Sequence, residues 1–269
     1  MLLVIDIGNT TIGLGLFPNP EKGAGLHVRK IPSHPVRSAD FYKGEIISLL
    51  RQRGTSFSLP QRNQDAAILS SVVPPLTRPV LRAVRELLGR RPLLVSHTLH
   101  GGLRFEVRHP DRVGADRIAT AVAGAHRYGK PVAVVDLGTA TTISVVGSGM
   151  RFLGGAIMPG IHLMGDSLSS RTAQLPSVAP GKPLPALGKD TRSAIASGLL
   201  YGTAGAVENI VKNMEKELAF RVQLVLTGGN APLLSSFLRR KHEVAPHLLF
   251  EGLRFIYLKT HGMETGTGE

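Results

Sequence analysis

Cysteine and tryptophan are absent from this 269-residue chain, and only 5% of its residues are aromatic. Without cysteine the chain has no disulfide, no thiolate metal site and no cysteine nucleophile. This absence favours a reducing compartment, and we expect the protein to be cytoplasmic. No apolar run is long enough to cross a bilayer, and we find no signal peptide, so we expect no membrane association.

Acidic residues are also scarce, with 19 Asp and Glu against 32 Lys and Arg, which gives a formal charge of +13. Such a surplus can indicate nucleic-acid binding. In residues 77–91, however, apolar positions keep helical spacing and leave Arg78, Arg82 and Arg85 on the opposite face, as on a solvated helix. The few aromatic residues do not alternate with basic ones, so a base-stacking platform is missing. We therefore expect no nucleic-acid partner, although the charge can attract anionic substrates.

Several common motifs are missing as well. The sequence has no G-x-x-x-x-G-K-[ST] loop, no G-x-G-x-x-G between a strand and a helix, and no H-E-x-x-H. Its ten histidines form no cluster with metal-ligand spacing. The remaining chemical groups are carboxylates, threonines and glycine turns, which suit phosphoryl transfer from a metal-bound nucleotide.

A hairpin with an unusual turn lies at the centre of the chain. Residues 132–146 read VAVVDLGTATTISVV, in which two β-branched runs flank a short turn and predict strand, turn, strand. Asp136 ends the first strand, and Gly138 permits a backbone conformation that other residues avoid. Hydroxyls follow at Thr139, Thr141 and Thr142. Hydroxyls and backbone N–H groups beside a carboxylate suit a phosphate that is accompanied by a cation.

The same pattern opens the chain, where residues 2–16 read LLVIDIGNTTIGLGL. This stretch aligns with the later one without a gap, placing Asp6 on Asp136, Gly8 on Gly138 and Thr11 on Thr141. A single Asp-x-Gly hairpin would mean little, but a repeat of half the chain length predicts a duplication. We expect an α/β protein with two similar domains, residues 1–112 and 113–269, each presenting a phosphate-binding hairpin to a shared cleft.

Residues 113–126 (VGADRIATAVAGAH) predict a helix that begins near Gly114. Asp116 and Arg117 then lie in its first turn, where unsatisfied N–H groups favour anions. An aspartate at this position is also what ordinary capping supplies. Arg117 argues against capping alone, because a cation is unfavourable at a helix N-terminus unless something recruits it.

The second half predicts a helix that starts at Pro159, where proline is well placed. A long helix follows, capped by Asp190 or Thr191 and running to about Leu218, and a T-G-G-N turn at residues 227–230 leads into a helix over residues 231–239. The long helix contains three glycines, which cost stability in a helix and therefore imply close packing against the neighbouring domain or a second subunit. These glycines are Gly198, Gly202 and Gly205.

Six segments together resemble the type III pantothenate kinase family. In chain order they are residues 6–13 (DIGNTTIG), 114–117 (GADR), 136–139 (DLGT), 154–160 (GGAIMPG), 191–198 (TRSAIASG) and 227–229 (TGG). The resemblance implies a duplicated actin-like, ribonuclease H-like kinase fold and a homodimer. It also implies ATP-dependent phosphorylation of pantothenate to 4′-phosphopantothenate, the first step of coenzyme A biosynthesis.

The resemblance further implies a role for each motif. The first phosphate loop for ATP comprises Asp6, Ile7, Gly8, Asn9, Thr10, Thr11, Ile12 and Gly13. Asp6 would lie near Mg²⁺, Thr139 would contact an ATP phosphate, and Asp136 would bind a monovalent cation, K⁺ or NH₄⁺.

Pantothenate is implied to bind at Gly114, Ala115, Asp116 and Arg117, with Thr191 as a further contact. Asp116 would be the base that takes the hydroxyl proton, and Arg117 suits the pantothenate carboxylate. The sequence departs from the family at Val107, where many members carry a substrate-contacting tyrosine.

Two other classes of function remain open from the sequence. One is another actin-like phosphotransferase or phosphatase, such as a sugar kinase or an exopolyphosphatase, against which the G-A-D-R segment argues. The other is a non-catalytic transcriptional accessory factor, which the basic charge fits and the acidic residues of all three motifs do not.

Overall fold

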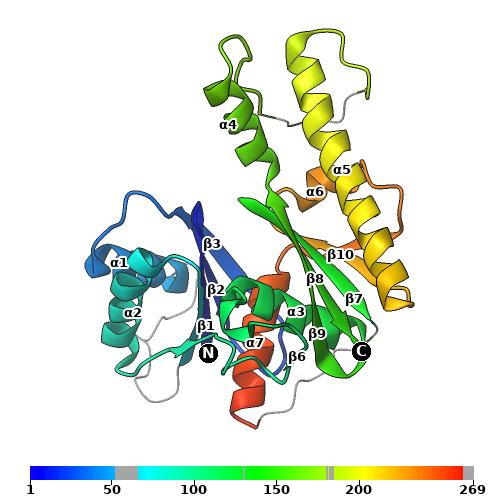
Figure 1. Ribbon diagram of the computed structural model, residues 1–269. Helices are drawn as coiled ribbons and strands as arrows, with labels where there is room; N and C mark the ends of the chain where they lie inside the picture. The colour runs from blue at the N-terminus through cyan, green and yellow to red at the C-terminus, as the bar shows by residue number, and fades with distance from the viewer. Residues whose placement is uncertain (52–65, 130, 180, 182–184, 263–269) are drawn as a thin grey trace. The chain divides into compact units, whose positions relative to one another are not determined.

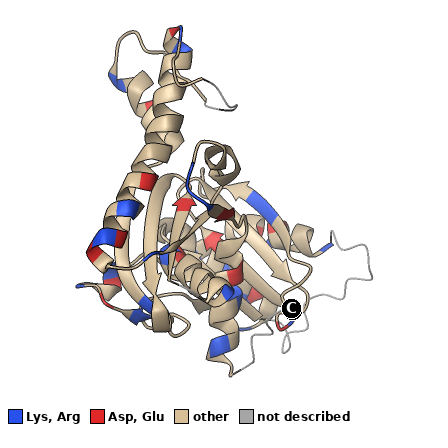
Figure 2. Cartoon of the chain, turned by 90° about the vertical axis from the view of Figure 1, so that its right-hand side faces the viewer, with Lys and Arg blue, Asp and Glu red and all other residues tan. Residues whose placement is uncertain are grey.

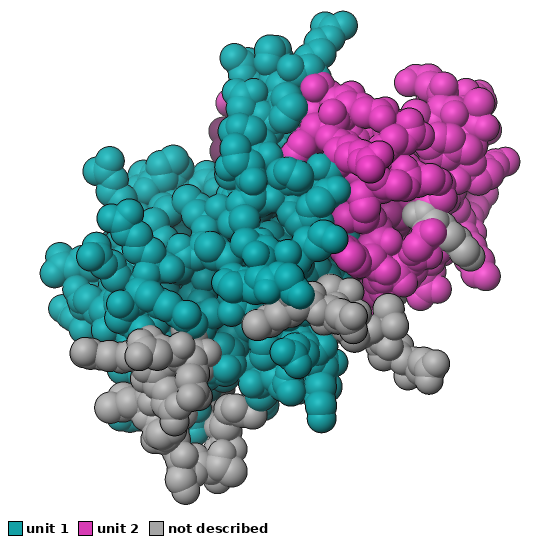
Figure 3. Space-filling model, turned by 90° about the horizontal axis from the view of Figure 1, so that it is seen from below, with its two compact units in different colours: residues 1–103, 108–123, 249–269 teal, residues 104–107, 124–248 magenta. Residues whose placement is uncertain are grey.

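The computed structural model describes residues 1–51, 66–129, 131–179, 181 and 185–262 (Figure 1). These residues form two compact units, which Figure 3 colours separately. Unit 1 comprises Met1–Leu103, Arg108–Ala123 and Leu249–Glu269, and unit 2 comprises Arg104–Val107 and Gly124–Leu248. The units do not coincide with the expected ranges 1–112 and 113–269, because most of one central helix and the C-terminal helix belong to unit 1.

Unit 1 is built on a five-stranded sheet with the order β3-β2-β1-β4-β5. β1 pairs antiparallel with β2 and parallel with β4, so both kinds of pairing meet at the first strand. The strands are β1 (Leu2–Ile7), β2 (Thr11–Phe17), β3 (His27–Pro32), β4 (Ala66–Ser71) and β5 (Leu93–Leu94).

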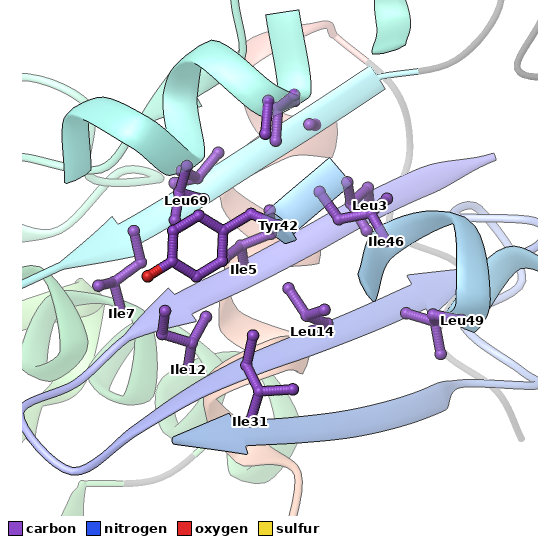
Figure 4. Packing of buried hydrophobic residues seen from close by; sticks show 14 of the residues in the cluster. Leu3, Ile5, Ile7, Ile12, Leu14, Ile31, Tyr42, Ile46, Leu49 and Leu69 are labelled. Atoms are coloured by element: carbon purple, nitrogen blue, oxygen red, sulfur yellow. The ribbon is translucent and has the colours of Figure 1, made fainter. Parts of the chain in front are cut away.

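One face of this sheet is covered by α1 (Ala39–Arg51) and α2 (Pro74–Leu88). Ser38 caps α1, since the Phe41 N–H donates to its Oγ atom over 3.3 Å. Alternate residues of β1, β2 and β4 point into this core together with one residue of β3, and Figure 4 shows them around the buried ring of Tyr42. The labelled strand residues in it are Leu3, Ile5, Ile7, Ile12, Leu14, Ile31 and Leu69.

The opposite face carries α3 (Ala115–Tyr128), as far as Ala123 within unit 1, and α7 (Leu248–Thr260). Gly13 and Gly15 of β2 leave room for the ring of Phe250 on this face. The two helices touch at Gly252, where an added Cβ would collide with the backbone of Ala119. The side chains of β1 and β4 that do not point into the α1–α2 core therefore point to this face.

Unit 2 repeats the plan with a six-stranded sheet in the order β11-β10-β7-β8-β9-β6. Read from β9 to β11, five of these strands match the order of unit 1, because β7 pairs antiparallel with β8 and parallel with β10 as β1 does with β2 and β4. The strands are β6 (Arg104–Phe105), β7 (Val132–Leu137), β8 (Ala140–Gly147), β9 (Arg151–Pro159), β10 (Gln223–Thr227) and β11 (His242–Val244). The shared topology is the duplication that the two hairpins predict.

The helices of unit 2 include α4 (Ile161–Arg171), α5 (Thr191–Leu218) and α6 (Ala231–Ser235). A core forms between the sheet and α5 and α6, with Ala133, Val135 and Leu137 of β7 pointing into it. A single 3₁₀ turn lies at Ser148–Met150 in this unit, and another lies at Pro110–Arg112 in unit 1.

Two expectations for unit 2 were wrong in detail. Pro159 does not begin a helix but ends β9, and Gly160 is the N-cap of α4. The helix expected over residues 231–239 ends at Ser235. The long helix agrees with its expectation, and Asp190 rather than Thr191 caps it through a reciprocal pair of hydrogen bonds with Ser193.

The gapless alignment of the two hairpins fails within the turn. Ile7 pairs with Ile12 in the first hairpin, whereas Leu137 pairs with Thr141 in the second, so the second turn is one residue shorter. A one-residue change of register turns a side chain to the other face of a sheet. Thr11 is accordingly exposed and Thr141 fully buried, and Thr141 is not the counterpart of Thr11.

Among the described residues, no helix combines the length and the apolar character that crossing a bilayer requires.

Candidate active site

The first Asp-x-Gly hairpin lies at the carboxyl end of β1. Gly8 donates its N–H to the Thr11 carbonyl over 3.1 Å, which closes the turn, and the side chains of residues 9–11 are exposed. Ser33 holds the turn from outside, donating its hydroxyl to the Gly8 carbonyl over 2.6 Å and its N–H to the Thr10 carbonyl over 3.0 Å. The loop is thus supported by buried hydrogen bonds while its polar face stays open.

Asp116 lies in the first turn of α3, where its Oδ1 atom accepts the Arg117 N–H over 2.8 Å. Its carboxylate folds back over Gly114 so closely that a Cβ at residue 114 would collide with Oδ1. Because α3 begins at Ala115, Asp116 is inside the helix and is not its N-cap residue. The simple capping explanation therefore does not describe its place.

Burial raises the pKa of the Asp116 carboxyl above its ordinary value of 3.8, although the hydrogen bond from the Arg117 N–H opposes the change. Burial also lowers the pKa of the Arg117 guanidinium, and the charge of Asp116 opposes that change. A raised carboxyl pKa makes the carboxylate a stronger base. A cap on an exposed helix end would show the reverse direction, because N–H donors stabilise the charged form.

The two motifs of unit 1 lie at the same end of its sheet. β1 and β4 run parallel, and the Val72 N–H, just after β4, donates to the Ile7 carbonyl over 3.1 Å. The position of a Cβ on Gly114 is 3.7 Å from a methyl group of Val72. The start of α3, with Asp116, therefore lies beside the strand that neighbours the Asp6 hairpin.

The second hairpin, in unit 2, presents Asp136 half-buried at the end of β7 and Thr139 exposed in the turn. The Gly138 N–H donates to the Ala140 carbonyl over 3.1 Å, which makes Ala140 the counterpart of Thr11. The Gly160 N–H, at the start of α4, donates to the Thr139 carbonyl over 3.0 Å. A side chain at residue 160 would collide with this turn, so the last glycine of the G-G-A-I-M-P-G segment is required sterically.

The T-G-G turn closes around Asp136 from the neighbouring strand. Thr227 pairs with Asp136 in the parallel β7–β10 ladder. Gly228 follows with φ of +90°, and a Cβ there would collide with the Asp136 carboxylate. Asn230 then donates its N–H to the Leu137 carbonyl over 3.1 Å, and its side chain is 3.2 Å from Nε2 of His162 on α4. Three segments of unit 2 thus meet at the second hairpin.

Thr191 is the first residue of α5 and is exposed. It lies at the rim of a groove of about 1160 Å³ between α4 and α5. Apolar side chains line most of this groove, and Arg171, Lys189 and Asp190 stand among them. The apolar lining comes mainly from Leu163, Met164, Leu168, Leu175, Ile195 and Leu199.

Val107, where the family often has tyrosine, is half-buried in unit 2. One of its methyl groups is 3.6 Å from the place of a Cβ on Gly154, a residue with φ of +117°. The valine therefore packs against the first glycine of the G-G-A-I-M-P-G segment and offers no polar atom there.

No group of three or more His, Asp or Glu side chains that could hold a metal ion occurs among the described residues. Mg²⁺ in kinases is held by one or two carboxylates together with substrate phosphates and waters, so a half-buried Asp6 beside an open turn is compatible with it. Asp136 lies beside a turn whose carbonyl oxygens, those of Gly138 and Thr139, approach Gly160. A carboxylate with nearby carbonyls is compatible with a larger monovalent cation.

The basic residues do not gather into one stripe in the view of Figure 2, where Lys and Arg occur on several elements with Asp and Glu between them. On α2, Arg82 is paired with Glu86 over 2.8 Å, and Glu86 also accepts from Lys43 over 3.0 Å. Part of the positive surplus near α2 is thus neutralised locally.

Solved structures with the same architecture are distant in sequence. An MreB 5 of Spiroplasma citri bound to AMPPNP has a TM-score of 0.55 and 10% identity, with 97% of this chain and 96% of that chain covered. A polyphosphate/ATP-glucomannokinase from an Arthrobacter strain has a TM-score of 0.50 and 14% identity, covering 97% and 98%. A Baf family transcriptional activator from Campylobacter jejuni has a TM-score of 0.56 and 18% identity, covering 97% and 100%.

The duplicated sheets, the paired hairpins and these neighbours define a protein with the actin-like fold of ATPases and sugar kinases. The sequence pattern of one family narrows this class, because the type III pantothenate kinase model matches residues 2–213. The chain belongs to the type III pantothenate kinase family.

Sequence reasoning identified the acidic residues of the site but missed their supports. Ser33 is fully buried and holds the first turn, yet it lies within a Pro-rich connection and carries no motif. The serine of β4 next to Asp6 was also missed, since a buried strand read from one sequence does not show which strand it pairs with. A short apolar run that ends in two serines, AAILSS, was the available signal.

Proposed function

We propose that the protein transfers the γ-phosphoryl group of ATP to the primary hydroxyl of pantothenate, giving 4′-phosphopantothenate and ADP in the first step of coenzyme A biosynthesis. Family membership supports the substrate pair. The observation that carries the proposal is Asp116, a half-buried carboxylate with a raised pKa, held over Gly114 at the sheet end that also carries the Asp6 hairpin. We expect the reaction to take place in the cytoplasm.

Asp116 acts as the general base. A primary alcohol is a poor nucleophile until it loses its proton, and a positioned carboxylate contributes roughly 10²–10⁴-fold by accepting that proton. Burial raises the pKa of the Asp116 carboxyl, which makes its carboxylate a stronger base for the hydroxyl proton. Arg117, the next residue, binds the pantothenate carboxylate, because a guanidinium group matches the geometry of a carboxylate.

The hairpins bind the nucleotide. The exposed turn of residues 9–11, closed by the Gly8–Thr11 hydrogen bond, holds ATP phosphates in unit 1, and Thr139 contacts a phosphate from unit 2. Asp6 would hold Mg²⁺ and Asp136 a monovalent cation, K⁺ or NH₄⁺. These cations would neutralise negative charge on the transferred phosphoryl group.

A homodimer completes the proposal. The described part of the chain places no atom within 4 Å of a Cβ on Gly198, Gly202 or Gly205, so no described segment covers the small-residue stripe of α5. Beside it, Leu163 and Leu168 of α4 are 49% and 36% exposed. An apolar groove of this size next to bare helix backbone fits a second copy of the chain.

The test is an acceptor screen with the purified full chain. Phosphate transfer from Mg·ATP to pantothenate is followed by mass spectrometry of the product, with and without K⁺, alongside glucose, other sugars and polyphosphate as acceptors. The proposal predicts a phosphorylated pantothenate product only. Transfer to a sugar in preference to pantothenate would assign the chain another actin-like phosphotransferase activity. DNA binding that weakens with salt, without ATP turnover, would favour a regulatory protein.

A further inference from the structure

Ser70 of β4 carries a buried hydroxyl group. The residue is 0% exposed, and its Oγ atom has no hydrogen-bond partner among the described residues. Buried polar groups almost always have a partner, and leaving a hydroxyl unpaired costs roughly 1–3 kcal/mol. An alanine would fill this position without that cost, so we expect the hydroxyl of Ser70 to have a function.

The neighbour of Ser70 across the sheet is Asp6. The two residues are register partners in the parallel β1–β4 ladder. Paired residues of adjacent strands point to the same face, and such strands are about 4.8 Å apart. This separation can be bridged by a hydrogen bond between a serine hydroxyl and an aspartate carboxylate after rotation of the side chains.

The side chains of Ser70 and Asp6 lie on the same face of the unit 1 sheet, the face that Asp116 approaches from α3. The alternate residues Leu69 and Ile7 point into the α1–α2 core, so Ser70 and Asp6 point to the face that carries α3 and α7. The Cβ atom of Asp6 is 3.9 Å from the place of a Cβ on Gly13, which itself faces Phe250 of α7. Val72, two residues after Ser70, contacts the start of α3 at Gly114.

The duplicated unit supports this assignment independently. In unit 2 the register partner of Asp136 in the parallel β7–β10 ladder is Thr227, another residue with a hydroxyl. Each half therefore places a hydroxyl side chain beside the aspartate that precedes its phosphate turn, although the segments that follow, Ser-Val-Val and Gly-Gly-Asn, have nothing in common.

We infer that Ser70 is a positioning residue for Asp6, donating its hydroxyl to the Asp6 carboxylate and thereby orienting it toward the magnesium ion of the bound nucleotide. The inference rests on the proposed function only in that the nucleotide is Mg·ATP. A carboxylate with one oxygen fixed by a buried hydroxyl presents the other in a single direction, and such supporting hydrogen bonds are worth about 10–100-fold in metal affinity. The cost of leaving the hydroxyl unpaired is tolerated because the hydroxyl orients Asp6 when the nucleotide is bound.

Ser71 offers a matched control one residue along the same strand. Its Oγ atom is 2.6 Å from the Thr77 hydroxyl and accepts the Val73 N–H over 3.3 Å, so it supports the start of α2. Its register partner is Ile7, which points to the α1–α2 core. Ser71→Ala removes a partnered hydroxyl from the structural face, whereas Ser70→Ala removes an unpartnered one from the face of the site.

The experiment compares wild type, Ser70→Ala, Ser70→Thr and Ser71→Ala in the full chain. Binding of Mg·AMPPNP is measured by calorimetry, binding of AMPPNP in EDTA is measured in the same way, and melting temperatures are recorded without ligand. We expect Ser70→Ala to weaken Mg·AMPPNP binding roughly 10–100-fold, to leave metal-free binding unchanged and to keep or raise the melting temperature. Ser70→Thr keeps the hydroxyl, as Thr227 does, and should restore most of the affinity. Ser71→Ala should melt lower and bind normally.

A double-mutant cycle shows whether Ser70 acts through Asp6. In an Asp6→Asn background, Ser70→Ala should cause no further loss of Mg·AMPPNP affinity, because the group that it positions is gone. Unchanged Mg·AMPPNP affinity in Ser70→Ala, or a loss that is equal with and without magnesium, would overturn the inference. A wild type that binds Mg·AMPPNP but phosphorylates no pantothenate would refute the proposed function and leave the inference on Ser70 standing.

Discussion

The carboxylate of Asp136 lies in the space that a side chain on Gly228 would occupy, and Asp116 lies over Gly114 in the same manner. Asp136 is therefore held by a glycine of a different motif, whereas Gly114 and Asp116 belong to the same G-A-D-R segment. Motifs that are distant in the sequence, D-L-G-T with T-G-G, depend on each other sterically. This dependence explains why a glycine is needed at residue 228 even apart from its φ of +90°.

Gly228→Ala should therefore impair the second hairpin. The methyl group would push the Asp136 carboxylate aside, and the positive φ would add strain of about 1 kcal/mol or more. We expect the K⁺ concentration for half-maximal activity to rise and kcat/KM to fall by at least about tenfold. Gly229→Ala is the matched control, because no described atom lies within 4 Å of a Cβ there. Equal behaviour of the two variants would contradict the steric coupling.

Replacement of K⁺ tests the role of Asp136 directly. Activity should require K⁺ or NH₄⁺ and be weak with Na⁺ alone, because a half-buried carboxylate beside carbonyl oxygens suits the larger cation. The first effect of Asp136→Asn should be a higher K⁺ or NH₄⁺ concentration required for activity, and complete loss of turnover should be a later effect. Steady-state rates in K⁺, NH₄⁺ and Na⁺ buffers of equal ionic strength provide the measurement, and full turnover in Na⁺ would exclude the cation site.

The dimer prediction concerns the apolar groove between α4 and α5. Leu163→Asp or Leu168→Asp should convert the dimer into a monomer, because each places a charge on an exposed apolar surface beside the bare glycines of α5. Light scattering at micromolar concentration gives the mass. Leu94→Asp, at a 42% exposed leucine in unit 1, is the control and should leave the mass unchanged. A monomeric wild type would refute the prediction.

Glu215 provides a prediction on stability alone. Its side chain is 4% exposed, accepts two hydrogen bonds from Arg240, over 2.8 and 2.6 Å, and accepts the Val222 N–H over 2.8 Å. Chiefly because of Arg240, the pKa of Glu215 falls from 4.5 to about 2. A lowered pKa stabilises the fold fully above the unfolded value of 4.5, and this contribution is lost as the pH falls toward 2.

Glu215→Gln should accordingly lower the free energy of unfolding by about 3 kcal/mol at pH 7. The difference from wild type should shrink when the pH falls below about 4.5. Urea denaturation of both proteins at pH 7 and pH 3.5 measures it. Glu217→Gln, on the exposed side of the same helix, should change stability little. A deficit that is independent of pH would mean that packing, and not charge, sets the effect.

The sequence contained the hairpins, their acids and the duplication, because alternating apolar residues and Asp-x-Gly turns are local signals. The shorter second turn was not predictable, since pairing of Leu137 with Thr141 depends on register. The C-terminal helix α7 was missed because it is buried on nearly all sides and lacks an amphipathic period. Ser33 and Ser70 were missed because their roles depend on contacts between segments distant in the chain.

Asp116 is the proposed base in phosphoryl transfer to pantothenate. The raised pKa of its carboxyl means that its ionised form is disfavoured by burial, so Asp116→Asn should keep or raise the melting temperature. The same raised pKa predicts that wild-type kcat/KM falls on the acid side as the base is protonated, at a pH above the ordinary 3.8.

The most direct measurement is kcat for pantothenate phosphorylation by wild type and Asp116→Asn at saturating Mg·ATP, together with the affinity of each for Mg·AMPPNP. The account predicts that kcat falls roughly 10²–10⁴-fold while nucleotide affinity and melting temperature are maintained. Asparagine keeps the size of the side chain and an oxygen that can accept the Arg117 N–H, so a purely structural role predicts normal turnover. Near-native kcat in Asp116→Asn would contradict the account, and the proton acceptor would then have to be a different group.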